Sequence, residues 1–354
     1  MNCDKGILIK NIYYMLSYAF QVLKESNYEG IATEEFENIY DLFAAILGRG
    51  IARQLKQGLY REYIEKEEDL STKRGKIIVA GTIRNKIQKK QRLTCEYDEL
   101  SENNVYNQIL KTTMLVLVRC PDVKRKHVSV LKKELLLFSA IDSLNPKEIR
   151  WDCIRFQKNN QEYRMLLGIC NMVLEGLILT TDSGDTRMAT FLDEQEMCHL
   201  YEKFILGYYK YHHPELVPNP DRIDWDIDEG KDGFLPAMQT DITLKGHGRT
   251  LIIDAKYYGQ VMQSRFEVQT IHSANLYQIY TYVKNLDSDR TRKVSGMLLY
   301  AKTQEQVQPN SRYVFDGNSI SVKSLDLNLP FSEIADQLEK IVEDYFVDRE
   351  EKIG

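Results

Sequence analysis

Two aspartates and a lysine in the second half of the chain have the residue types of a metal-dependent hydrolytic site. Asp254 and Lys256 end an apolar run that begins at Leu251, and Asp241 lies a short distance before that run. Side chains two apart on a β-strand point to the same face of a sheet. The spacing therefore predicts that the carboxylate of Asp254 and the ammonium group of Lys256 share one face of a strand.

The turn between two predicted strands, residues 238–245 and 250–257, decides where Asp241 lies. If all four intervening residues form the loop, antiparallel pairing places Asp241 directly opposite Asp254. A two-residue turn at Gly246-His247 places Asp241 diagonally opposite, still on the same face. Only an odd-numbered loop or a bulge would turn it to the other face.

Two carboxylates this close need a compensating charge, because directly paired side chains have Cβ atoms about 5 Å apart and like charges there are destabilising. Mg²⁺, with Mn²⁺ as a substitute, could bridge Asp241 and Asp254, since it favours hard oxygen ligands and keeps several waters. Lys256 could then orient or deprotonate a water, or balance charge on a phosphate. Together these groups could hydrolyse a phosphodiester. The alternative is a surface hairpin with an ordinary Asp–Lys ion pair.

Three further side chains are candidates for the same site. Gln278 and Tyr282 lie four apart on a predicted helix and so share a face, from which they could contact a DNA backbone or position the lysine. Glu202 lies in a periodic helix upstream of the hairpin and could supply a third metal-binding carboxylate. The alternatives are a half-exposed helix in a tyrosine-rich chain and a solvent-facing glutamate.

The elements that must position these residues favour two domains, because 354 residues exceed the usual size of one. We expect an α/β protein: a mostly helical N-terminal region with a β-arm or hairpin (1–155), followed by a mixed α/β domain with a central sheet (156–354). Periodicity predicts helices at 11–23, 34–57, 102–118, 128–140, 161–179, 191–211 and 273–284, and strands at 238–245, 250–257 and 293–300. Residues 75–81 could form short strands or a hairpin arm.

The chain is acidic overall and basic in one place. Its net charge is −5, so any DNA contact must be local or helped by a partner. Residues 72–94 contain no acidic residue and carry a stretch of basic ones: Lys73, Arg74, Lys76, Arg84, Lys86, Lys89, Lys90 and Arg92. This basic stretch is either a solvated face or a contact for phosphate or an acidic partner surface.

Several classes of function are disfavoured by what the sequence lacks. Every apolar run is interrupted before the roughly 20 residues of a membrane-spanning helix, so no membrane association is expected. The six cysteines include no Cys-x-x-Cys pair, which argues against a zinc site or a disulfide framework and fits the cytoplasm. No Walker-type glycine-rich loop is present, so the chain is not expected to hydrolyse nucleotides itself.

Several motifs resemble known families. Asp241…Asp254-x-Lys256 resembles the PD-(D/E)xK nuclease signature, and Gln278-x-x-x-Tyr282 resembles the QxxxY element of its RecB-like branch. Segments 11–19 (Asn-Ile-Tyr-Tyr-Met-Leu-Ser-Tyr-Ala), 58–63, 74–77 and 97–103 are similar to the McrC family, the nuclease subunit of the McrBC modification-dependent restriction system. This similarity spans nearly the whole chain. One departure from the nuclease signature is Thr240, which stands where the proline is expected.

The resemblance implies a PD-(D/E)xK restriction-endonuclease-like fold for residues 156–354, with Asp241, Asp254 and Lys256 as catalytic residues. It also implies that residues 1–155, including the basic stretch, engage the central channel of a McrB-like AAA+ GTPase hexamer. That partner would bind GTP and carry the part that recognises modified cytosine in double-stranded DNA, while this chain stimulates GTP hydrolysis and cuts. Two other functions stay open: a non-catalytic adaptor that stimulates the GTPase, and a stand-alone repair or defence nuclease.

Overall fold

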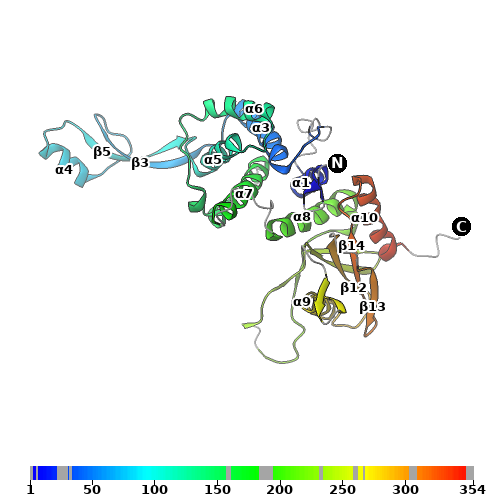
Figure 1. Cartoon of the computed structure of the whole chain (residues 1–354). Coiled ribbons are helices and arrows are strands. Elements are labelled where there is room, and N and C mark those ends of the chain that lie inside the picture. The colour runs from blue at the N-terminus through cyan, green and yellow to red at the C-terminus, as the bar shows by residue number, and fades with distance from the viewer. Residues whose placement is uncertain are drawn as a thin grey trace. The chain divides into compact units, whose positions relative to one another are not determined.

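The structure is a computed structural model of the chain (Figure 1). In it the protein divides into two compact units. The structure describes residues 3–4, 7–21, 31, 34–156, 161–182, 194–230, 234–257, 262–265, 268–302 and 309–347. The helix-and-arm unit is Phe43–Ile178, and the sheet unit combines Met1–Leu42 with Leu179–Gly354. This contact-based division differs from a linear split after residue 155, because the first helix of the chain belongs with the C-terminal part.

That first helix, α1 (Ile9–Phe20), packs along α8 (Glu194–His212) in the sheet unit. The two backbones approach closely at Gly207, where an added Cβ would collide with the carbonyl oxygen of Tyr18. Asn11 ties α1 to the C-terminal part as well, because its amide donates to the carbonyl oxygens of Leu327 (2.6 Å) and Leu329 (2.8 Å). These long-range contacts explain why α1 is not part of the helix-and-arm unit.

A bundle of helices forms the body of the helix-and-arm unit. Its main helices are α3 (Ile39–Gln57), α5 (Val105–Arg119), α6 (Arg125–Leu137) and α7 (Gln161–Asp182). The helix expected from residue 34 begins only at Ile39, because the side chain of Asn38 accepts a hydrogen bond from the backbone N of Asp41 (2.9 Å) and caps the first turn. Asn104 caps α5 in the same way through the N of Asn107 (3.2 Å).

A β-arm extends from this bundle, as the sequence predicted, but it also carries a helix that the sequence did not (Figure 1). Its three-stranded sheet has the order β3-β5-β4 and is built from β3 (Glu62–Leu70), β4 (Lys76–Ile77) and β5 (Leu93–Ser101). The helix α4 (Val79–Ile87) lies against β5, where Asn85 is buried and donates to the hydroxyl of Thr94 (3.1 Å).

A five-stranded mixed sheet forms the core of the sheet unit, as predicted, with the order β13-β14-β12-β9-β8. Strands β9, β12 and β14 are parallel, and the edge strands β8 and β13 are antiparallel to their neighbours. Helix α9 covers one face, and α8 and α10 cover the other. The bounds are β8 (Ile242–Gly246), β9 (Arg249–Lys256), α9 (Ser273–Leu286), β12 (Val294–Ala301), β13 (Ser311–Phe315), β14 (Asn318–Leu325) and α10 (Phe331–Phe346).

Short elements complete the described chain. The paired two-stranded ribbons are β1 (Cys3–Asp4) with β2 (Ile7–Leu8), β6 (Arg222–Ile223) with β7 (Met238–Gln239), and β10 (Met262–Arg265) with β11 (Val268–Ile271). Single-turn 3₁₀ helices are η2 (Pro146–Glu148), η3 (Trp151–Cys153) and η4 (Pro214–Leu216). Among all the described helices, none is long and apolar enough to span a bilayer.

Candidate active site

The β8–β9 hairpin turns through His247 and Gly248, which both have positive φ (50° and 69°), as the commonest two-residue hairpin turns require. The turn therefore lies one residue later than the two-residue turn considered from the sequence. The resulting pairs, such as Lys245↔Thr250 and Ile242↔Ile253, have the register that was expected to place Asp241 opposite Asp254. One step further, Asp241 falls opposite Asp254, although β8 itself begins at Ile242.

Asp241 is held against the edge of β9 from two sides. Its Oδ2 accepts a hydrogen bond from the backbone N of Ala255 at 2.9 Å. Its neighbour Thr240 is buried and fixed to Asp221, because the N of Thr240 donates to the Asp221 carbonyl (2.9 Å) and the N of Asp221 donates to the Thr240 hydroxyl (2.9 Å). Thr240, which stands in place of the signature proline, thus positions Asp241 through backbone contacts that the sequence did not reveal.

Asp254 is almost completely buried, with 1% of its side chain exposed, and it faces Lys256. The Lys256 Nζ donates to Oδ1 at 3.0 Å and lies 2.9 Å from Oδ2. Despite this short ion-pair distance, Oδ2 accepts no hydrogen bond of acceptable geometry from any described residue. A buried carboxylate oxygen without a hydrogen-bond donor is costly unless a cation takes that place.

The electrostatics of the pair favour a bound cation. Burial, as the largest cause, and the negative charges of Asp254 and Glu202 together raise the pKa of Asp241 to about 7, against the opposing effect of Lys256. Burial also raises the pKa of Asp254, against the pull of Lys256. Two buried carboxylates share one ammonium group, so a divalent cation would offset the remaining repulsion. The available ligands fit Mg²⁺, because both are hard carboxylate oxygens. One of them, Oδ2 of Asp254, accepts no hydrogen bond from a described residue.

Glu202 of α8 lies near the aspartates and, with Asp241, lines a cavity of about 340 Å³. Its carboxylate accepts from the Cys198 thiol (3.3 Å) and lies 3.3 Å from Nδ1 of His199. Burial raises the pKa of Cys198 to about 11, so this thiol stays neutral. Within the described ranges no three His, Cys, Asp or Glu side chains are grouped closely enough to hold a metal ion. The structure therefore brings two aspartates together, with Glu202 beside them.

Gln278 and Tyr282 lie one turn apart on α9, and the amide of Gln278 donates to the Tyr282 hydroxyl at 3.0 Å. Tyr282 is 8% exposed and packs with Ile252 and Leu298 in the core between α9 and the sheet. Asp254 pairs with Leu298 and so points to this same face. The two side chains share a face as the spacing predicted, and the buried tyrosine anchors the half-buried Gln278.

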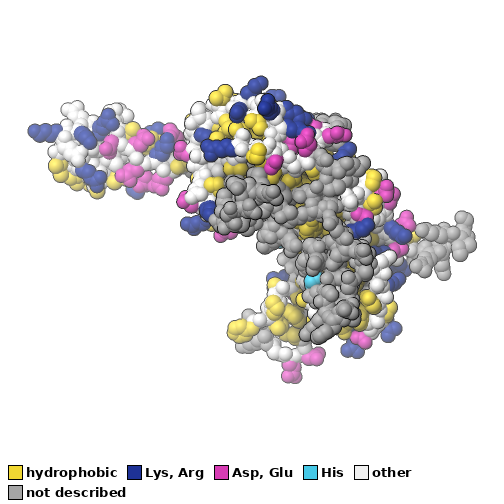
Figure 2. Space-filling model, viewed as in Figure 1, with side chains coloured by type: hydrophobic (Ala, Val, Ile, Leu, Met, Phe, Trp, Pro, Cys, Tyr) yellow, Lys and Arg dark blue, Asp and Glu magenta, His cyan; other side chains and the backbone are white. Residues whose placement is uncertain are grey.

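The basic stretch lies in the other compact unit, on the arm, and all eight of its side chains belong to exposed residues. Three of them contact the arm itself: Arg74 stacks over the Tyr97 ring, Lys76 pairs with Glu96 (3.1 Å), and Arg92 donates to the Asp69 carbonyl (3.3 Å). The other five form no ion pair within the described ranges: Lys73, Arg84, Lys86, Lys89 and Lys90. Figure 2 shows Lys and Arg side chains at the tip of the arm and Asp and Glu side chains nearer its base.

The arrangement defines a class of protein: an α/β fold consistent with that of nucleases, with Asp254 and Lys256 on one face of a mixed sheet and Asp241 bonded to the backbone N of Ala255 between them. The sequence profile of the McrBC 5-methylcytosine restriction system component matches residues 5–301, and the chain belongs to this family.

Two known proteins show how far the similarity extends. The chain is 26% identical to the type IV methyl-directed restriction enzyme EcoKMcrBC of Escherichia coli (strain K12) over 96% of its own length and 98% of that protein. Its fold resembles a McrB AAA+ hexamer assembly with bound McrC from Thermococcus gammatolerans, with a TM-score of 0.51 and 17% identity over 95% of this chain and 75% of that one. This structural likeness supports the fold alone.

Proposed function

We propose that this chain is the endonuclease subunit of a GTP-dependent restriction complex and that it hydrolyses phosphodiester bonds in DNA with Mg²⁺. The observation that carries the proposal is the closeness of Asp241, bonded to the backbone N of Ala255, to the buried Asp254, whose negative charge raises the pKa of Asp241. Lys256 is bonded to Asp254, and Oδ2 of Asp254 accepts no hydrogen bond from a described residue. Membership of the McrBC family supports DNA as the substrate.

In the proposed mechanism Asp241 and Asp254 would hold Mg²⁺, which would supply Lewis acidity and make a nearby water easier to deprotonate. Hydrogen bonding from the Ala255 N fixes one oxygen of Asp241 and leaves the other for the site. Lys256, 12% exposed, orients a water or balances charge that develops on the phosphate. Gln278, anchored by Tyr282, contacts the DNA backbone near the lysine, and Glu202 accepts a hydrogen bond from a water beside Asp241.

The proposed partner is a McrB-like AAA+ GTPase hexamer, which binds GTP and carries the part that recognises modified cytosine in double-stranded DNA. The Thermococcus gammatolerans assembly that this fold resembles contains McrB AAA+ hexamers with bound McrC. The arm is the proposed contact, because α4 exposes an apolar stripe of Val79, Ile83 and Ile87 (66%, 53% and 77% exposed) beside unpaired basic residues. Exposed apolar side chains in line with cations are typical of a binding surface.

A non-catalytic adaptor that only stimulates the GTPase is the second candidate, because the arm alone could serve that role. The buried, mutually repelling aspartates speak against it: a site that no longer holds a cation would keep the cost of burying them without a benefit.

Reconstitution separates the two functions. The chain, a McrB-like GTPase, GTP, Mg²⁺ and a methylated plasmid are mixed, and plasmid cleavage and GTP hydrolysis are measured in parallel. Cleavage should require every component, fail with EDTA or unmethylated plasmid, and be lost in Asp254→Asn while stimulation of the GTPase persists. Stimulation without cleavage by the unaltered chain would assign the adaptor function, and full cleavage by Asp254→Asn would exclude the candidate site.

A further inference from the structure

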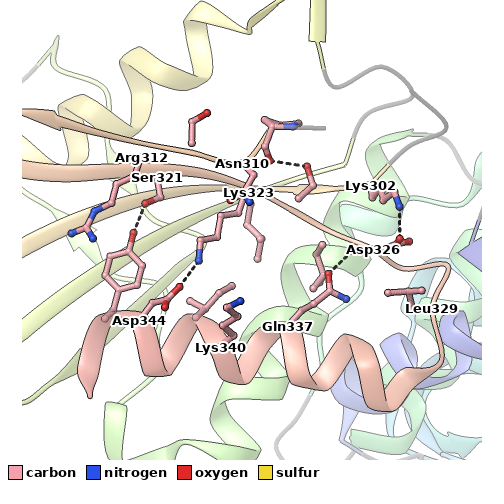
Figure 3. Close-up of a pocket in the computed structure, with 17 residues that line it drawn as sticks. Lys302, Asn310, Arg312, Ser321, Lys323, Asp326, Leu329, Gln337, Lys340 and Asp344 are labelled. Atoms are coloured by element: carbon pink, nitrogen blue, oxygen red, sulfur yellow. Dashed lines mark hydrogen bonds and ion pairs between the residues drawn. The ribbon is translucent and has the colours of Figure 1, made fainter. Parts of the chain in front are cut away.

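A second cavity lies between α10 and the strands β12, β13 and β14 (Figure 3). Asp254, Leu298 and Val322 form one row across β9, β12 and β14, and the two apolar members pack toward α9. The next row ends in Leu299 and Lys323 and therefore points to the other face, beneath α10. There the cavity has a volume of about 690 Å³ and both residues line it.

The strands place polar side chains in this cavity where packing against a helix would favour apolar ones. Leu299 and Leu325 follow the expected pattern, whereas Ser321 and Lys323 of β14 break it, and the exposed edge strand β13 adds Arg312 at the rim. Ser321, only 2% exposed, lies beside Arg312, its partner in the antiparallel ladder. Polar residues at positions that a helix covers cost stability, so such a break of pattern is an indication of function.

Among the described residues that line the cavity are four basic groups and two carboxylates, so the charges of this set do not balance. Lys302 pairs with Asp326 at 2.5 Å and Lys323 pairs with Asp344 at 2.7 Å, as the dashed lines in Figure 3 show. These two pairs use both carboxylates. The cavity is therefore left with an excess of two positive charges.

The excess comes from Arg312 and Lys340, neither of which forms an ion pair with a described residue. Arg312 donates only its Nε, to the Ser319 hydroxyl at 2.7 Å, and so keeps its terminal nitrogens available. Lys340 extends from α10 on the side that faces the strands (Figure 3). Near Arg312, the hydroxyls of Ser321 and Tyr345 bond to each other at 2.6 Å, so one of them still has a donor or acceptor position to offer.

We propose that this cavity binds a phosphate group between Arg312 and Lys340. A guanidinium group matches the oxygens of a phosphate with two parallel hydrogen bonds, and an ammonium group adds a point charge. The phosphate belongs either to a free phosphorylated small molecule or to the backbone of DNA. Because the residues that line this cavity do not include Asp241, Asp254 or Lys256, the bound phosphate is not the one that is cut.

Binding to the full chain is measured in EDTA with two probes: inorganic pyrophosphate, and a single-stranded 12-nucleotide DNA without 5′ phosphate. The Arg312→Gln/Lys340→Gln variant tests the cavity. The Lys210→Gln/Lys293→Gln variant removes the same charge from exposed positions in the same unit. Asp254→Asn removes the candidate active site, so that failure of the proposed nuclease function is distinguished from failure of this site. Unchanged thermal unfolding of each variant without ligand establishes that it is folded.

The cavity variant should bind pyrophosphate about 10- to 100-fold more weakly, as the loss of charge-assisted contacts predicts. The control and Asp254→Asn should bind as the unaltered chain does. If the cavity variant weakens only the binding of DNA, the phosphate comes from the DNA backbone and the site is upheld. Equal affinities of the cavity variant and the unaltered chain for both probes, or equal losses in the cavity and control variants, would overturn the proposal.

Discussion

At the scale of residues, the candidate site is a buried charge imbalance. Asp241 and Asp254 lie close together, and the ammonium group of Lys256, which bonds to Asp254, opposes the rise in the pKa of both. Because the pKa of Asp241 is raised to about 7, a proton can take the place of a cation near neutral pH. Carboxylate ligands must lose that proton before they bind a metal, so the proton and Mg²⁺ compete for the same site.

Replacing Asp241 by Asn should stabilise the metal-free protein at pH 8 and remove its response to Mg²⁺. The folded-state pKa of Asp241 lies above the ordinary value of 3.8, so its contribution to stability is present below about pH 4 and is lost as pH rises through about 7. We expect the free energy of unfolding of Asp241→Asn, compared with that of the unaltered chain, to be larger at pH 8 than at pH 4 by on the order of 1–3 kcal/mol. Thermal unfolding at both pH values, with and without Mg²⁺, measures this gain; an undiminished response to Mg²⁺ would place the metal elsewhere.

Lys256→Gln should separate catalysis from metal binding. The substitution removes the ammonium group that contacts Asp254 but leaves both carboxylates to hold Mg²⁺. Cleavage by the reconstituted complex should fall by about 10²- to 10⁴-fold, the usual contribution of a positioned acid or base. Stabilisation by Mg²⁺ should persist. Single-turnover cleavage measures the first effect, and thermal unfolding with and without Mg²⁺ measures the second. If the substitution abolishes cleavage and stabilisation by Mg²⁺ together, Lys256 serves only to hold the aspartates in place.

At the scale of elements, the sequence predicted those helices and strands whose formation depends on residues close to one another in the chain. The β8–β9 hairpin and helix α9 were predictable, because a short apolar run bounded by glycines is typical of a buried strand and the period of the apolar residues in α9 matches the face that it buries. Helix α4 was not, since Val79–Ile87 contains β-branched residues and a glycine, and its contacts are with distant β5: Gly81 touches Thr94, to which Asn85 is bonded. For residues after 300 the sequence yielded no prediction, although α10 repeats apolar residues at helical spacing.

Local patterns could not predict the packing of α1 on α8 either, because the two helices are far apart in the sequence. Gly207→Ala tests this contact: its Cβ would collide with the Tyr18 carbonyl, so α1 must move and lose packing such as that of Tyr18 on Phe331. We expect a loss of about 1–3 kcal/mol in the free energy of unfolding. Denaturant unfolding measures it, with Lys210→Ala at an exposed position of α8 as the control. Equal stability of the two variants would contradict the close approach.

At the scale of the whole molecule, the net charge of −5 conceals a strong segregation of charge along the arm. Near its base, carboxylates of β3 and β5 pair with the inner cations, as Lys66 does with Glu99 and Lys76 with Glu96. Around α4 the cations are exposed and lie beside the apolar stripe of Val79, Ile83 and Ile87. A protein of negative net charge can therefore bind an acidic partner surface locally through a basic, partly apolar tip.

Reversing two charges at this tip should therefore weaken assembly with the GTPase partner. We expect Lys86→Glu/Lys89→Glu to lower affinity on the order of tenfold, or about 1.4 kcal/mol, and the loss to shrink as salt is added, because exposed charges are screened. Lys132→Glu/Lys133→Glu on α6 reverses the same charge at exposed positions of the same unit but away from the arm. Sedimentation of the mixed proteins at two salt concentrations measures both variants. If they assemble equally well, the basic stretch is a solvated face and the partner contact lies elsewhere; a selective loss at the tip assigns the contact to the arm.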